Sequence, residues 1–272
     1  MRARILVRGV LPAAALLVAA GGLAAQDDSA EWLRHCRDNH GWGRGSGYCE
    51  VRESNMPAGG TLNVDARDNG GVRVLGWDRN EVHVEARVQA RAGSDAEARA
   101  LAGRVRITTA GGTIRADGPH VEGRDRGWSV SYIVRVPRRS DLTVRTLNGP
   151  IGVERVSGRM DLSAVNGPLS LSEVGGDVRG RTENGPLRVS LSGARWQGTG
   201  LDVRTTNGPV VLTVPESYAA HLDVGNTNGP MALDFPVTVS GRIGHHIVTD
   251  LNGGGPTIRA MTVNGPIAVK RP

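Results

Sequence analysis

From Gly60 onwards, apolar and polar residues alternate in short runs that are separated by turns. The apolar residues of each run share one face in the segments 62–66, 72–74, 82–88, 105–107, 113–115 and 130–136. A period of two is typical of a strand with one face on a core and the other in water. The pattern therefore predicts a strand-rich segment over residues 58–140.

One stretch of this segment departs from the alternation. Ser94 can cap a helix, Glu97 follows three residues later, and Ala98, Leu101 and Ala102 then share a helical face. A Ser-x-x-Glu capping box before an apolar run marks the start of a helix. We predict one short helix here.

From residue 141 to residue 272 the chain repeats one motif, Asn-Gly followed closely by Pro. The seven asparagines are Asn148, Asn166, Asn184, Asn207, Asn228, Asn252 and Asn264, at spacings of 18, 18, 23, 21, 24 and 12 residues. Apolar residues predominate four and six positions before each Asn and three and five positions after it. Each Asn is therefore predicted to be a corner between two alternating strands.

A corner that recurs about every twenty residues is typical of a solenoid, in which each repeat buries its apolar face by stacking on the next. Asn and Gly tolerate positive φ, Pro is tolerated at the first residue of a strand, and stacked asparagines can hydrogen-bond in a row. The predicted fold is all-β, a single-chain β-solenoid of about seven coils. Because Asn-Gly also marks hairpins, an antiparallel meander is the alternative.

Residues 1–25 have the pattern of a secretory signal peptide. Arg2, Arg4 and Arg8 precede the apolar stretch 10–20, and small residues follow it. The apolar stretch is shorter than the ~20 residues that a spanning helix needs. We predict cleavage after residue 24 or 25, export to the periplasm or the cell surface, and no membrane span after cleavage.

Residues 26–57 form a polar segment that contains both cysteines, Cys36 and Cys49. An isolated pair in an oxidising compartment is typical of a disulfide. A zinc site that adds His35 and His40 is the alternative, but the spacing of the cysteines matches no zinc-finger pattern. We predict the disulfide, a short helix over residues 28–37, a loop in the remainder, and no metal or cofactor.

The composition argues against nucleic acid as a partner. The formal net charge of +6 includes the three leader arginines, and the other basic residues are scattered along the predicted strands. Nucleic-acid-binding proteins usually carry a basic patch with groove-fitting or aromatic elements. Aromatic residues make up 3% of this chain, so such a surface is not expected.

No catalytic constellation stands out. His245 and His246 are adjacent, so on a strand they would point to opposite faces and could not both ligate one ion without a bend. Carboxylates recur along the repeats, which raises the alternative of a polysaccharide-active enzyme on a β-helix. Such enzymes need paired carboxylates or a bound cation, and usually aromatic sugar platforms. We predict a protein that is not an enzyme.

Three successive repeats carry insertions, at 195–200, 216–220 and 235–244. These insertions contain Trp196, Tyr218 and Phe235. Insertions of this kind often emerge on a binding face, and aromatic side chains often anchor interfaces. The three aromatic residues are therefore candidate interaction residues, and covering the end of a widened core is their alternative role.

Three local patterns occur together in this chain. They are the segment Gly71–Asp78 leading into Glu81–Val84, the short helix after it, and the repeats with flanking Thr. Over residues 60–272 this combination resembles a bacterial exported β-strand-repeat family known as an adhesin-like domain of unknown function. The resemblance implies a β-solenoid, an exported location and, in some relatives, a link to envelope-stress regulation; it implies no catalytic residue. The leading hypothesis is an interaction scaffold for an unknown envelope protein or glycan, and a self-assembling envelope element is a further alternative.

Overall fold

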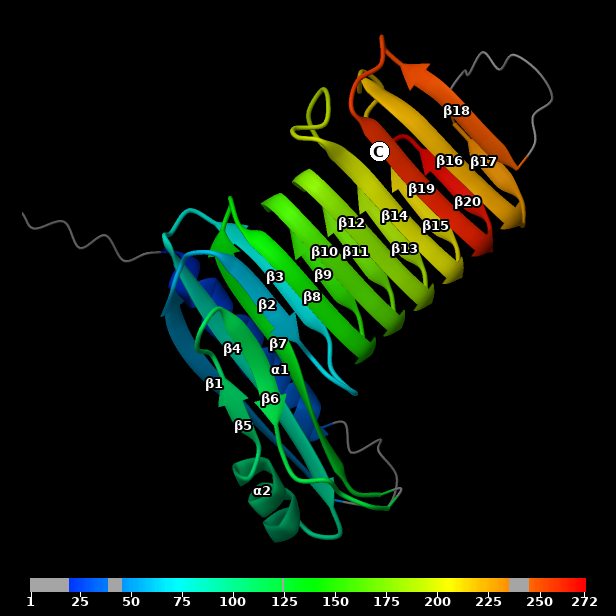
Figure 1. Cartoon of the computed structure of the whole chain (residues 1–272). Coiled ribbons are helices and arrows are strands. Elements are labelled where there is room, and N and C mark those ends of the chain that lie inside the picture. Colours follow the sequence, from blue (N-terminus) through cyan, green and yellow to red (C-terminus); the bar gives the residue numbers. More distant parts are fainter. Residues whose placement is uncertain (1–19, 39–45, 124, 235–244) are drawn as a thin grey trace, which may run out of the picture.

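A computed structural model of the protein describes residues 20–38, 46–123, 125–234 and 245–272. These residues form two helices, α1 (Ala20–Asp38) and α2 (Asp95–Gly103), and two large mixed sheets of ten strands each (Figure 1). The protein is therefore mostly β, as the alternating pattern predicts.

In the first sheet the order is β1 (Ser46–Pro57), β4 (Glu81–Ala92), β7 (Gly127–Pro137), β3 (Val72–Trp77), β9 (Ile151–Glu154), β11 (Leu169–Ser172), β13 (Leu187–Ser190), β15 (Val210–Thr213), β20 (Ile267–Lys270) and β17 (Met231–Leu233). In the second sheet it is β18 (His246–Leu251), β16 (Ala220–Asn228), β19 (Thr257–Asn264), β14 (Gly200–Asn207), β12 (Gly175–Asn184), β10 (Ser157–Asn166), β8 (Asp141–Asn148), β2 (Thr61–Asp65), β6 (Thr113–Asp117) and β5 (Arg106–Thr108).

The two strands that flank a corner belong to different sheets. β10 ends at Asn166 in the second sheet and β11 begins at Leu169 in the first, and each pairs in parallel with its counterpart from the next repeat. The register is regular, with Asn166 opposite Asn184 and Leu169 opposite Leu187. An antiparallel meander is therefore wrong for these repeats, because a hairpin would pair the flanking strands with each other.

Six of the seven predicted corners form one row of side chains, which Asn69 extends at one end; we call these seven residues the corner row. In spatial order its members are Asn69, Asn148, Asn166, Asn184, Asn207, Asn264 and Asn228. From Asn166 to Asn228 each side-chain amide donates to the Oδ1 of the preceding member at 2.8–2.9 Å. Asn148 donates to the carbonyl of Asp68 at 2.7 Å and to Asn69 at 3.4 Å.

The stacking order does not follow the chain at its C-terminal end. The repeat of Asn264 lies between those of Asn207 and Asn228, because β19 pairs with both β14 and β16. β18 pairs antiparallel with the other side of β16. Asn252 therefore lies outside the corner row, in the turn that connects β18 to β19. It has a φ of 45° and donates to the carbonyls of Glu216 and Tyr218.

The glycine after each corner asparagine is required by close stacking. A Cβ on Gly149, Gly167, Gly185 or Gly208 would lie 2.1–2.2 Å from the carbonyl oxygen of the glycine in the preceding corner. The sequence suggested that these glycines are present because glycine tolerates positive φ. That reason is wrong for these four, because none of them has a positive φ. Thr182 and Thr205, two residues before their corners, donate to the carbonyls of Gly167 and Gly185 at 2.8 and 3.0 Å.

The predicted N-cap of α2 is confirmed, although the Glu97 carboxylate accepts from the N–H of Gly93 at 3.2 Å rather than from that of Ser94, as a capping box requires. Ser94 is the N-cap, and its side chain accepts a hydrogen bond from the Glu97 N–H at 3.3 Å. In contrast, the predicted loop over 46–57 is wrong, because these residues form β1 and pair antiparallel with β4 along its whole length. Arg52 of β1 also donates to the carbonyls of Ala102 and Val105 at the end of α2. A long partner strand and these contacts order a segment whose composition favours a loop.

Candidate functional site on the outer face of the first sheet

Helix α1 lies against the outer face of the first sheet, over the strands β1 and β4 (Figure 1). Cys36 on the helix is bonded to Cys49 on β1, so the predicted disulfide is confirmed. Gln89 of β4 donates to the Sγ of Cys36 at 3.4 Å. The helix is longer than the one predicted over residues 28–37.

The disulfide should stabilise the attachment of α1 to the sheet. Replacing Cys36 and Cys49 together by serine should lower the free energy of unfolding of the N-terminal region by about 2–4 kcal/mol, because the closed loop no longer restricts the unfolded chain. Hydrogen exchange of α1 and β1 measures this loss, with the amides of β12 as the internal control. Unchanged protection of α1 in the double variant would contradict the prediction.

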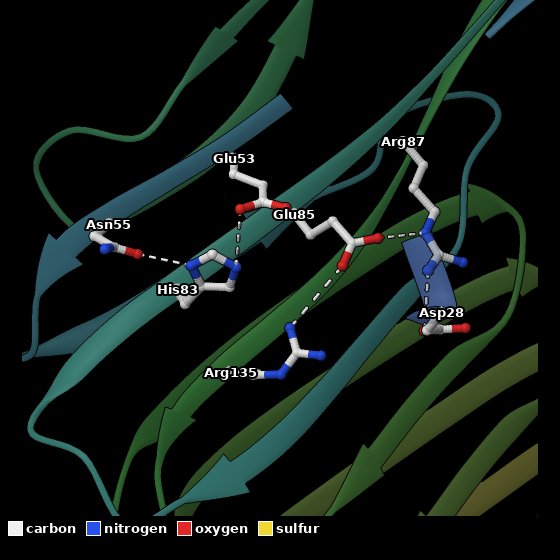
Figure 2. Close-up of polar contacts among 7 residues, drawn as sticks. All are labelled: Asp28, Glu53, Asn55, His83, Glu85, Arg87 and Arg135. Carbon is white, nitrogen blue, oxygen red and sulfur yellow. Dashed lines mark hydrogen bonds and ion pairs between the residues drawn. The ribbon is translucent and has the colours of Figure 1, made fainter. Parts of the chain in front are cut away.

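A row of charged side chains lies along β4 on the same face (Figure 2). The side chain of Glu85 is 1% exposed and accepts a hydrogen bond from Arg87 Nε at 2.7 Å. Its other oxygen faces Arg135 Nη1 of β7 at 4.0 Å. Arg87 also donates to Asp28 of α1 at 3.0 Å and lies over the ring of Trp32, 5.3 Å from its centroid. This buried ionic cluster therefore joins β4, β7 and α1.

His83 belongs to the same row and lies near the N-terminal end of β4. Its Nδ1 is 2.7 Å from Oδ1 of Asn55, and its Nε2 is 4.0 Å from Oε2 of Glu53, both on β1 (Figure 2). This row is not among the residues predicted from the sequence. The only signal was that every outward position of β4 is polar, and a solvated strand face has the same pattern.

A shallow groove of about 660 Å³ begins at α1 and crosses the outer face of the first sheet as far as β13. Four of its six outward residues on the repeat strands are small, namely Gly152, Ser170, Ser172 and Ser190; the other two are Glu154 and Arg188. Trp32 and Arg87 line it at the helix end, and Arg73, Glu154 and Arg188 line it over the strands. The groove thus combines an aromatic ring, small residues that leave the strand backbone accessible, and charges of both signs.

The histidines near the C-terminus attach β18 to the edge of β16. Nε2 of His246 is 2.6 Å from Asp223, which Arg259 also contacts at 2.7 Å, and Nδ1 of His221 is 2.6 Å from Asp250. Burial raises the pKa of the Asp223 carboxyl, but the hydrogen bonds from His246 and Arg259 outweigh it and hold the pKa below its usual value. His245 contacts Asn226 instead, at 3.0 Å.

Two of the three candidate interaction residues are part of the core. Trp196 and Tyr218 are 3% and 1% exposed, and Nε1 of Trp196 donates to the carbonyl of Gly176 at 2.9 Å. The insertions fold back over the repeats and bury these rings, so the structure gives them the alternative role of covering the core. Phe235 lies outside the described residues.

Within the described ranges, no group of three or more His, Cys, Asp or Glu side chains is placed to hold a metal ion. No helix of those residues is long and apolar enough to cross a membrane.

Comparison with family models and with curated proteins finds no match. Among solved structures, the chain is similar to a candidate cell adhesion protein from Clostridium sporogenes, at 8% identity and a TM-score of 0.46 over 82% of this chain and 100% of that one. A candidate adhesin from Bacteroides fragilis matches at 8% identity and a TM-score of 0.36 over 82% and 97% of the two chains. These values are too low to carry an argument, so the resemblance to the adhesin-like family stays a prediction.

Proposed function

We propose that the protein is a non-enzymatic, adhesin-like interaction scaffold, and that the groove beside α1 is its contact surface. The partner is an extended hydrophilic chain, a glycan or a protein segment of the cell envelope. The observation that carries this proposal is the groove itself, because the small residues among its lining let a chain approach the sheet while Trp32, three arginines and the carboxylates of Asp28 and Glu154 flank it. Aromatic rings and arginines are the usual anchors of binding surfaces.

We further propose that the repeats form a β-solenoid, which would hold this surface rigid. The parallel register of successive repeats and the continuous corner row support this architecture. Contact surfaces on stacked strands are positioned more accurately than surfaces on loops.

The proposal includes export. The leader pattern of residues 1–25 and the disulfide support it, because disulfides persist in oxidising compartments. Cleavage after residue 24 or 25 would leave Asp28, Trp32 and Cys36 in place on α1. We also propose that the rest of the chain divides into a polar segment (residues 26–57), a strand-rich segment (58–140) and the repeats (141–272).

Introducing an arginine at Gly152 should abolish partner binding without unfolding the protein. A Cβ at Gly152 would meet only the Cγ of Arg73, at 3.9 Å, so the backbone accepts a side chain there, and a long one would extend over the groove floor. The measurement is binding of the oxidised chain to a glycan array and to immobilised envelope proteins. Thr143→Arg on the outer face of the second sheet is the matched control, because it adds the same charge on β8.

The expected result is that Thr143→Arg binds like the natural chain and that Gly152→Arg loses at least tenfold in affinity. Equal binding by both variants would place the contact surface elsewhere. Release of shortened products from a bound glycan would show an enzyme and overturn the non-enzymatic part of the proposal.

A further inference from the structure

A second hollow lies on the outer face of the first sheet, at the other end of the charged row from His83. It is a cavity of about 540 Å³ that is lined by the disulfide, by β4 and β7, and by the corner residues Asn69 and Asn148. Pockets that bind small molecules usually measure about 300–1,000 Å³. The cavity is therefore large enough for a ligand of one or two sugar rings.

The sheet itself creates this hollow around Arg91. In the register of the sheet, Arg91 of β4 lies opposite Gly47 of β1 and opposite Gly127 of β7. Neither neighbour has a side chain, so the space on both sides of the arginine stays open. Gln89 and Ser129, which lie opposite each other two residues along the strands from Arg91 and Gly127, line the same cavity.

Arg91 is held in place and still has an unused donor. Its Nη2 donates to Asp125 at 2.5 Å, and its side chain is 20% exposed. Its Nε is buried and has no hydrogen-bond acceptor in the described part of the chain. Because this Nε is buried, a ligand in the cavity would meet the outer guanidinium nitrogens instead, which carry more N–H groups than Asp125 accepts.

The corner row ends at the same cavity, which Asn69 lines. Its side-chain amides donate in one direction, from Asn228 toward Asn69. The donor end is Asn69, whose Oδ1 accepts from Asn148 and whose NH₂ group is the last donor of the series.

A second guanidinium belongs to the rim of the cavity. Arg126 lines it, and its Nη2 donates to Glu97 of α2 at 2.9 Å. Asp125 and Glu97 therefore each hold an arginine by one nitrogen, which leaves further N–H groups of both guanidinium groups for a ligand. A carboxylate accepts such donors in pairs.

We propose that this cavity binds an acidic monosaccharide unit. The carboxylate lies at the outer guanidinium N–H groups of Arg91 and Arg126 that Asp125 and Glu97 do not use, and the sugar hydroxyl groups bind Asn69, Gln89 and Ser129. A simple carboxylate would not contact these amide and hydroxyl groups, which is why the sugar is favoured over an isolated anion. The site adjoins the groove beside α1, and Gly71, Ser131 and Pro150 line both.

The test is titration calorimetry of the oxidised full chain with glucuronate, galacturonate, glucose and acetate. We expect at least one of the two uronates to bind at least tenfold more tightly than glucose and acetate, and raising NaCl from 50 to 500 mM to weaken that binding severalfold. Equal binding of glucose and the uronates, no binding of either uronate at millimolar concentration, or tighter binding of a short acidic peptide would each overturn the proposal.

Two variants test the geometry. Arg91→Gln should weaken binding of the preferred uronate at least tenfold, and Asn69→Asp should weaken it too by placing a negative charge at the exposed end of the corner row. Arg145→Gln on β8 is the matched control and should leave binding unchanged. Gly152→Arg should also leave uronate binding unchanged. The proposal about the groove and the proposal about this cavity can therefore fail independently. Circular dichroism checks the fold, and full binding by both folded site variants would overturn the assignment.

Discussion

Replacing Gly185 by alanine should destabilise the protein by at least about 3 kcal/mol. The new Cβ would lie 2.2 Å from the carbonyl oxygen of Gly167, and the three atoms nearest to it are all backbone atoms of the adjacent corner. A flexible side chain could move away, but stacked backbone cannot move without breaking the register of β12 with β10 and of β13 with β11. Chemical denaturation followed by circular dichroism measures the change.

The matched control is Gly103→Ala near the end of α2. A Cβ there would meet no atom within 4 Å, so the substitution should be neutral or stabilise the protein by up to about 1 kcal/mol. If both glycine variants had the same stability as the natural chain, the corners would be less closely stacked than the structure has them.

Truncating the inner leucines should have the second large effect. Leu162 of β10 and Leu187 of β13 are both 0% exposed, and they belong to one continuous core between the two sheets. Leu162→Ala and Leu187→Ala should each lower the free energy of unfolding by about 2–5 kcal/mol, because each leaves a cavity that the stacked strands cannot close.

An outward residue supplies the comparison. Arg145 of β8 is exposed, so Arg145→Ala should cost less than about 0.5 kcal/mol. Thermal unfolding of the three variants side by side checks the register. Equal losses for leucine and arginine would mean that the inward and outward positions are exchanged, because a shift of one residue reverses every side chain of a strand.

The sequence by itself determined which face of the stacked repeat strands is inward. It was wrong for β18, where Val248 at a predicted inward position is 52% exposed and Ile247 is buried. Side-chain direction alternates along any strand, so the apolar positions around the corners had to share a core. The N-cap of α2 and the pairing of Cys36 with Cys49 were equally readable, because each depends on local spacing or on the only two cysteines present.

Only the tertiary structure decided which strands, corners and insertions are neighbours. Asn252 differs locally from Asn264 because three glycines instead of one precede its proline, but this does not show which of the two is stacked; the pairing of β19 with both β14 and β16 does. Trp196 became core because its insertion folds back over the repeats, and β1 became a strand because β4 offered a partner edge. The cavity at Arg91 likewise arises from Gly47 and Gly127, which are 80 residues apart in the sequence and neighbours of the same arginine in the sheet. Contacts of this kind depend on which strands pair, and strand pairing is a property of the whole chain rather than of any local segment.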